Sequence, residues 1–101
     1  MPKLLRVVKS EKPSKKWKAI FKMDSGREKT THFGFKNPND PKNDYTLHKD
    51  KARRERYRIR HKKDLKTNDP TRAGFLSYYL LWGDSTSLRK NIADYKKRFN
   101  L

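Results

Sequence analysis

The sequence predicts an α+β fold, in which a small antiparallel β-hairpin or three-stranded sheet is followed by three α-helices. Two periodicities predict it. Apolar residues alternate with lysines in the first third of the chain, as in a half-buried strand, and recur every three or four positions in the last third, as in an amphipathic helix. A length of 101 residues leaves room for one domain. We therefore expect a single basic domain with a β part at 1–36, a loop at 37–48 and a helical part at 49–101.

The hairpin is the clearest local element. Residues 16–23 alternate between an apolar side and a basic side, with Ile20 as the exception: Trp17, Ala19, Phe21 and Met23 face one way, and Lys16, Lys18 and Lys22 the other. Residues 24–26 supply turn chemistry, and a second strand follows at 28–35. Because a lone hairpin is marginal in water, we expect the apolar run at 4–9 to add a third strand or the helices to cover the pair.

The middle of the chain combines a loop with a highly basic helix. Residues 37–44 contain two prolines and five Asn or Asp side chains, which predicts a loop. Residues 50–63 are rich in helix-favouring Ala, Arg, Glu and Lys but have no wide apolar stripe. Residues 51–66 carry nine cations against two carboxylates, the densest charge in the sequence.

The last third predicts two more helices. Asp69 as an N-cap and Pro70 at the first helical position predict the start of a central helix, whose apolar residues at 73–82 should be buried. Gly83 is expected to end it in a left-handed cap. Ser85 or Thr86 can cap a final helix. That helix carries an apolar stripe formed by Leu88, Ile92, Tyr95 and Phe99.

The charge is the strongest indication of function. The chain has 28 Lys and Arg against 11 Asp and Glu, a formal net charge of +17, so it repels itself and attracts polyanions or acidic protein surfaces. Without cysteine it has no disulfide and no thiolate zinc site, which fits a reducing compartment. It also contains no apolar run of membrane-spanning length and no signal segment at its start.

Two sets of cations are the candidate partner-binding residues, one on the basic helix and one on the basic side of the hairpin. They are Lys16, Lys18, Lys22, Arg53, Arg54, Arg56, Arg58, Arg60, Lys62 and Lys63. Guanidinium groups match phosphate oxygens bidentately, so a nucleic acid could neutralise the helix, and an acidic protein surface could do the same. The composition leaves both partners open. The hairpin aromatics and lysines face opposite ways, so we expect these rings to pack in the core rather than to stack on bases.

Catalytic, cofactor and metal sites are not expected. The histidines, His32, His48 and His61, are far apart in the sequence, and no cysteine accompanies them. The chain has no glycine-rich phosphate loop, no nucleophile elbow and no paired carboxylates in an apolar setting. We therefore expect a protein that binds rather than an enzyme.

Several short runs carry a resemblance to known proteins. They are TTHFG at 30–34, DYTLHKD at 44–50, RRERY at 53–57, and IADYKKRF at 92–99, with Arg60-His61, Ala73-Gly74 and Leu80-Leu81-Trp82 between them. In this order they resemble a family of small basic proteins encoded by large nucleocytoplasmic DNA viruses, including those of algae and the mimivirus relatives. The resemblance runs from about residue 17 to residue 99.

The resemblance implies a viral protein of the virion or of its assembly, made in the host cytoplasm, and it carries over no catalytic or ligand residue. The first interpretation is a minor capsid protein that cements neighbouring capsid proteins or bridges the shell to the acidic inner membrane surface. The alternative is a DNA- or RNA-binding protein without sequence preference that acts on the viral genome. Cations alone mainly set orientation and association rate, so the first interpretation also needs repetition or apolar anchors.

Overall fold

The computed structural model describes residues 2–101 and has the α+β architecture that the sequence predicts. Three strands, β1 (Lys3–Lys9), β2 (Lys15–Lys22) and β3 (Glu28–Phe35), form an antiparallel sheet in the order β1-β2-β3. The hairpin and the third strand are both confirmed. Gly26 takes a φ of 87° in the β2–β3 turn, where the Met23 backbone N–H donates a hydrogen bond of 2.8 Å to the Arg27 carbonyl.

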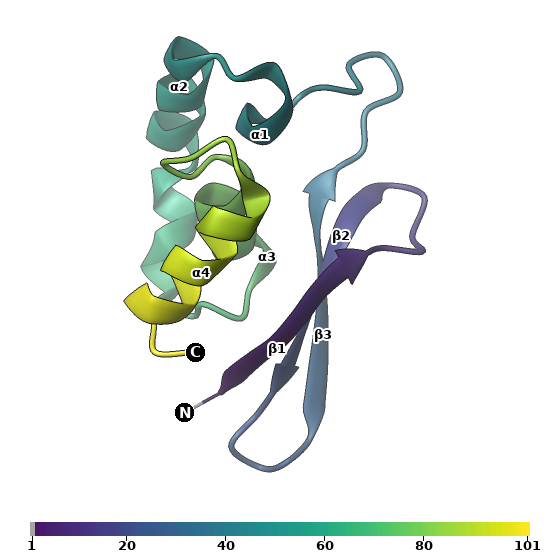
Figure 1. Cartoon of the computed structure of the whole chain (residues 1–101), viewed down its shortest axis with the longest axis vertical. Coiled ribbons are helices and arrows are strands. Elements are labelled where there is room, and N and C mark those ends of the chain that lie inside the picture. Colours follow the sequence, from purple (N-terminus) through teal and green to yellow (C-terminus); the bar gives the residue numbers. More distant parts are fainter. Residues whose placement is uncertain (1) are drawn as a thin grey trace.

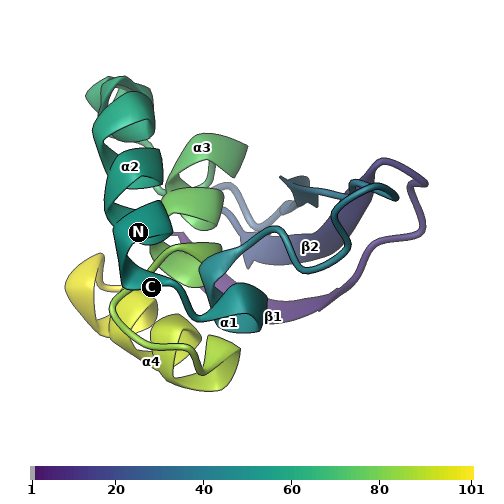
Figure 2. The ribbon, with the colours of Figure 1, turned by 90° about the horizontal axis from the view of Figure 1, so that it is seen from above.

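The helices gather on one face of this sheet (Figure 1, Figure 2). They are α1 (Tyr45–His48), α2 (Lys51–His61), the 3₁₀ segment η1 (Lys62–Thr67), α3 (Ala73–Leu76), the π-helical turn η2 (Ser77–Leu81) and α4 (Leu88–Arg98). The expected loop at 37–48 is therefore shorter than predicted, because its last four residues form α1. Asp44 caps α1 by accepting a hydrogen bond from the Thr46 backbone N–H at 3.0 Å, which is the local reason for this extra turn.

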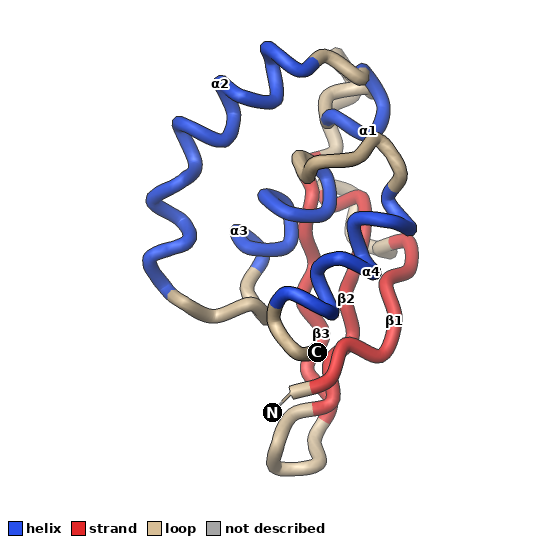
Figure 3. The backbone as a smooth tube through the Cα atoms, turned by 60° about the vertical axis from the view of Figure 1, so that its left-hand side comes forward, coloured by secondary structure: helices blue, strands red, loops and turns tan. Residues whose placement is uncertain are grey.

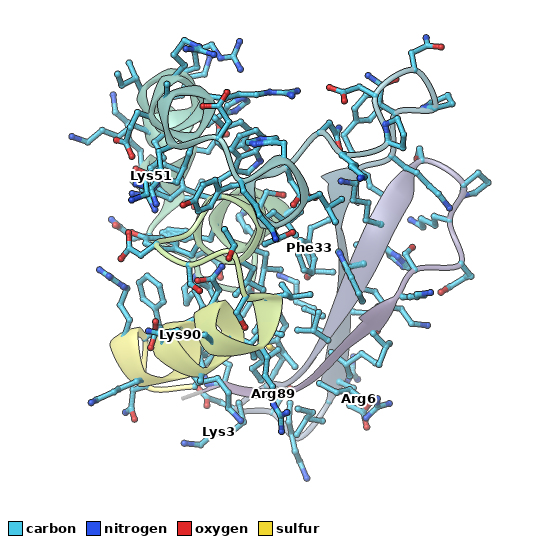
Figure 4. All side chains as sticks on the ribbon, turned by 45° about the horizontal axis from the view of Figure 1, so that its top comes forward. Lys3, Arg6, Phe33, Lys51, Arg89 and Lys90 are labelled. Carbon is cyan, nitrogen blue, oxygen red and sulfur yellow. The ribbon has the colours of Figure 1, made fainter. Side chains whose placement is uncertain are left out.

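The apolar sides of both layers meet in one core. The sheet contributes Ala19, Phe21 and Phe33, all fully buried, and Figure 4 shows Phe33 between the sheet and the helices. From the helical side come Tyr45, Phe75, Leu76, Leu80, Leu81, Trp82 and Tyr95. The predicted stripe of α4 is confirmed, since Tyr95 is buried and Leu88, Ile92 and Phe99 pack against the core.

The expected cap at Asp69 is wrong. The helix begins at Ala73, and Asp69 instead accepts hydrogen bonds from the backbone N–H and the hydroxyl of Thr71, at 3.0 and 2.6 Å. Thr71 is buried, and its carbonyl accepts a hydrogen bond of 2.7 Å from the Thr31 hydroxyl of β3. This hydrogen bond to the sheet holds residues 69–72 in a turn, so the helix begins at Ala73 rather than at Pro70.

The region between η2 and α4 also differs from prediction. Gly83 is not left-handed; a Cβ at Gly83 would lie 2.2 Å from the Tyr79 carbonyl oxygen, so the position requires glycine for space. The N-cap of α4 is Ser87, whose hydroxyl accepts from the Lys90 N–H, rather than Ser85 or Thr86. The buried Asn91 holds the connection, because its Nδ2 donates to the carbonyls of Leu80 and Ser85 at 3.0 and 2.7 Å. These contacts come from packing, so the local pattern could not show them.

Candidate functional site

The inner side of α2 is attached to the domain by two arginines that were expected to contact a partner. Arg54 is only 14% exposed; its Nη1 donates to the carbonyls of Gly83 and Asp84 at 3.4 Å, and its guanidinium lies 4.7 Å from the Tyr45 ring centre. Arg58, 20% exposed, donates to the Trp82 carbonyl at 2.8 Å and to the Asp84 carboxylate at 2.9 Å. Both arginines are therefore structural.

An aromatic stack completes this attachment. The Tyr57 ring lies nearly parallel to the Trp82 ring, at 4.1 Å between centres, and the His61 ring stacks on its other side at the same distance. Burial raises the pKa of Tyr57 to about 12, so its hydroxyl stays neutral at physiological pH. α2 can thus dock through arginines and rings without the wide apolar stripe that its sequence lacks.

The three lysines expected on the outer face of the sheet have different environments. Lys16 is turned to the interior, where its Nζ lies 2.5 Å from Asp44 Oδ2; the two side chains are 12% and 4% exposed. Lys18 pairs with the exposed Glu11 at 2.9 Å. Lys22 is exposed at the end of β2. Only Lys18 and Lys22 therefore remain on an accessible surface, and Lys16 is a structural cation.

Three accessible cations lie on the solvent side of α2 and at the start of η1. Arg56 of α2 and Lys62 and Lys63 of η1 are exposed around Ile59, which is 76% exposed; we call these four residues the outer face of α2. None of the three cations forms an ion pair or a side-chain hydrogen bond with any residue in 2–101. Ile59 was missed as a functional candidate, although its spacing from Arg56 and Lys63 already placed the three on one helix face.

A cleft of about 450 Å³ lies between α2 and the end of the sheet at Phe35. Figure 3 shows α2 standing away from the strands beyond α3. Its three carboxylates are all engaged: Asp40 with Arg53 at 2.7 Å, Asp44 with Lys16, and Asp64 with His61 at 3.1 Å. Two further cations line the cleft, Lys15 from β2 and Arg60 from α2, and neither has an ion-pair partner among the described residues.

His48 occupies the junction between α1 and α2. Its Nδ1 accepts a hydrogen bond of 2.9 Å from the Asp50 N–H, so the proton of the neutral ring sits on Nε2, which is buried without a hydrogen-bond partner within 2–101. Its ring lies 5.2 Å from that of Trp82. Burial lowers the pKa of His48; Arg53 lowers it further, and Asp44, Asp50 and Asp40 oppose the shift.

This lowered pKa predicts loss of stability in mild acid. The unfolded chain gains a proton at His48 near its ordinary pKa of 6.5, whereas the folded chain resists it, so stability is full above that pH and falls below it. We expect a lower melting temperature at about pH 5.5 than at about pH 7.5. His48→Phe, which keeps an aromatic ring but cannot titrate, should flatten this dependence. An unchanged pH profile in that variant would contradict the assignment.

Within residues 2–101, no three His, Cys, Asp or Glu side chains are grouped so that they could share a metal ion. The same part of the chain contains no helix with the length and apolar character needed to cross a membrane.

Comparison with known proteins identifies the family. Residues 5–61 match the model of a family of unknown function, DUF5754. The chain belongs to the DUF5754 family. The DUF5754 match runs from β1 to the end of α2, so it includes both Lys15 and Arg60 of the cleft, and Arg56 and Ile59 of the outer face of α2 but not Lys62 or Lys63. No curated protein and no solved structure matches the chain.

Proposed function

We propose that this protein is a non-enzymatic structural component of the particle of a large DNA virus, a minor capsid protein that binds acidic surfaces of neighbouring capsid proteins. The resemblance in the runs at 30–57 and 92–99 supports the viral setting, and the net charge of +17 supports an acidic partner. The outer face of α2 is the contact surface, because its cations form no ion pair or side-chain hydrogen bond within residues 2–101.

The observation that carries the proposal is the exposure of Ile59 among these cations. A surface that binds only phosphates needs no apolar side chain at its centre, whereas protein interfaces combine an apolar anchor with a charged rim. Ile59 is 76% exposed and lies between Arg56 of α2 and Lys63 of η1 along the chain. It supplies the apolar anchor that charges alone lack, and its cationic surroundings match an apolar pocket rimmed by Asp and Glu.

The charges and the anchor should act on different steps of binding. Arg56, Lys62 and Lys63 speed and orient the encounter with an acidic surface, and their effect weakens as salt screens it. Ile59 holds the complex by burying apolar area, which salt does not screen. Many copies around a shell then add avidity to a modest single contact.

The test measures binding of the purified protein to the major capsid protein of the virus that encodes it, and separately to duplex DNA. We expect Ile59→Ser to weaken capsid binding about tenfold, mainly through faster dissociation, and to leave DNA binding unchanged. The double variant Arg56→Glu, Lys63→Glu should weaken both. DNA binding should be independent of sequence and collapse between low and physiological salt.

The matched control is Lys12→Glu with Arg27→Glu, which changes the net charge equally at two sheet turns far from α2 (Figure 1). It should bind the capsid protein nearly as the wild type does. A sequence-selective DNA complex that persists at physiological salt, together with an unchanged capsid affinity in Ile59→Ser, would favour a genome-binding protein. Copurification with the DNA core after the shell is stripped, or retention on anionic vesicles alone, would also count against binding to capsid proteins.

A further inference from the structure

The cleft between α2 and the sheet has a residual positive charge that its own carboxylates do not neutralise. Asp40 pairs with Arg53 and Asp44 with Lys16, whereas Asp64 bonds His61, which is a cation only when it is protonated. Four Lys and Arg side chains therefore line the cleft against three carboxylates, and two of the four, Lys15 and Arg60, have no ion-pair partner among the described residues. These two belong to different walls, since Lys15 lies on β2 and Arg60 on α2. An anion held between them would join the walls and relieve the repulsion of two unpaired cations that face one space.

An exposed aromatic ring lies on the same side of the sheet as one of these cations. Phe35 is 62% exposed and lines the cleft. It pairs directly with Lys15 in the β2–β3 register, and residues directly opposite in an antiparallel pair share a face. This is the combination that nucleic-acid platforms need and that Phe21 and Phe33 lack, because those two rings are fully buried.

A third feature of the cleft is an unsatisfied hydrogen-bond acceptor. The Nδ2 of Asn43 donates to the Phe35 carbonyl at 3.1 Å, which fixes the orientation of the amide. Its Oδ1 is buried and has no hydrogen-bond partner in the described chain. Asn43 also lines the cleft, so a ligand that brings an N–H donor would remove this defect.

We propose that this cleft binds one nucleotide unit, with its phosphate between Lys15 and Arg60, its base against the Phe35 ring and an N–H of the base near Asn43 Oδ1. The volume of about 450 Å³ is in the usual range for a small-molecule site. An inorganic anion would use only the cations, and an apolar ligand only the ring, whereas a nucleotide uses all three features. The site is separate from the outer face of α2 and does not depend on the capsid proposal.

The experiment titrates ¹⁵N-labelled full-length protein with AMP, UMP, inorganic phosphate and a 5′-phosphorylated oligo(dA), and follows amide chemical shifts. We expect AMP and the oligonucleotide to shift resonances of Lys15, Phe35 and Arg60. AMP should bind about tenfold or more tightly than phosphate, because base stacking adds to charge neutralisation. It should also bind more tightly than UMP, because the larger purine ring stacks more extensively on Phe35.

Substitutions of two exposed residues test whether the base stacks on Phe35 and whether the phosphate binds Arg60. Phe35→Ser should reduce AMP affinity about tenfold or more while leaving phosphate binding unchanged, and Arg60→Gln should weaken both ligands. Arg56→Gln, which removes one charge from the outer face of α2, is the matched control and should alter neither. Binding of the free nucleotide as tightly as the oligonucleotide would identify a mononucleotide site, and binding of the oligonucleotide alone would identify a strand end; both support the proposal.

Three results would overturn it: no cleft resonance shifts at millimolar AMP or with the oligonucleotide, phosphate binds as tightly as AMP, or Arg56→Gln weakens AMP binding as much as Arg60→Gln does. The variant Ile59→Ser separates this test from that of the capsid proposal. It should bind AMP normally even if capsid binding is lost, so either proposal can fail alone.

Discussion

Asp44→Ala is expected to lower the free energy of unfolding by about 4 kcal/mol, because removing one partner of a buried ion pair leaves the other charge uncompensated. Lys16 would remain in the interior at 12% exposure with no carboxylate at its Nζ. The same substitution removes the N-cap of α1, where the Asp44 carboxylate accepts hydrogen bonds from the backbone N–H and the hydroxyl of Thr46. Urea denaturation with an unchanged m-value measures the loss.

Asp40→Ala is the matched control for this prediction. Asp40 also pairs with a cation, Arg53, but both side chains are about two-fifths exposed, so its removal should cost about 1 kcal/mol or less. Equal losses for the two variants would mean that Lys16 reaches water without Asp44. In that case Lys16 would return to the accessible basic surface that the alternation of residues 16–22 predicts.

Gly83→Ala is expected to cost about 3 kcal/mol, although Gly83 has an ordinary backbone conformation. The new methyl group would lie 2.2 Å from the Tyr79 carbonyl oxygen and 2.9 Å from Asn91 Cγ. Neither neighbour can move freely, because the oxygen belongs to the backbone and Asn91 is held by hydrogen bonds to Leu80 and Ser85. Thermal and urea unfolding of the variant measure the effect.

Gly26→Ala provides the comparison for Gly83. A Cβ at Gly26 meets no atom within 4 Å, and the cost comes from its φ of 87° alone, about 1 kcal/mol. A loss for Gly83→Ala as small as that for Gly26→Ala would show that the η2–α4 connection relaxes easily. In that case the backbone of this connection would move to make room for the methyl group. We would then expect the hydrogen bonds of Arg54 and Arg58 to the carbonyls at 82–84 to be disturbed.

The basic helix shows how far the sequence can predict a binding surface. Its charge density and its helical conformation follow from residues 51–61 alone, and both are found in α2. Its arginines have two different roles, however. Arg54 and Arg58 attach the helix to the carbonyls at 82–84, whereas Arg56 and Arg60 are exposed. Which arginines are structural and which are exposed depends on which side of α2 packs against residues 82–84. Those residues lie about 25 positions further along the chain, so the sequence of the helix alone cannot show it.

The hairpin is a second element in which the sequence predicts the face of a residue but not its burial. The period of two predicts that Phe33 and Phe35 share a face, and they do, but only Phe33 lies beneath the helices. Phe35 extends past the helical layer into the cleft with Lys15. The same period predicts an outward Lys16, and it fails there because Asp44 offers a buried carboxylate that alternation cannot anticipate.

By itself the sequence determined the elements that depend on neighbouring residues: the two strands of the hairpin, a charged helix, an apolar centre at 73–82 and a final amphipathic helix. Periodicity and turn chemistry are local, so they can be recognised from a short window of residues. Only the tertiary structure decided which cations are used inside the domain and which stay accessible, and where the helices start and stop around Thr71 and Gly83. Those outcomes depend on contacts between distant segments, where burial, available space and a nearby carboxylate outweigh local preference.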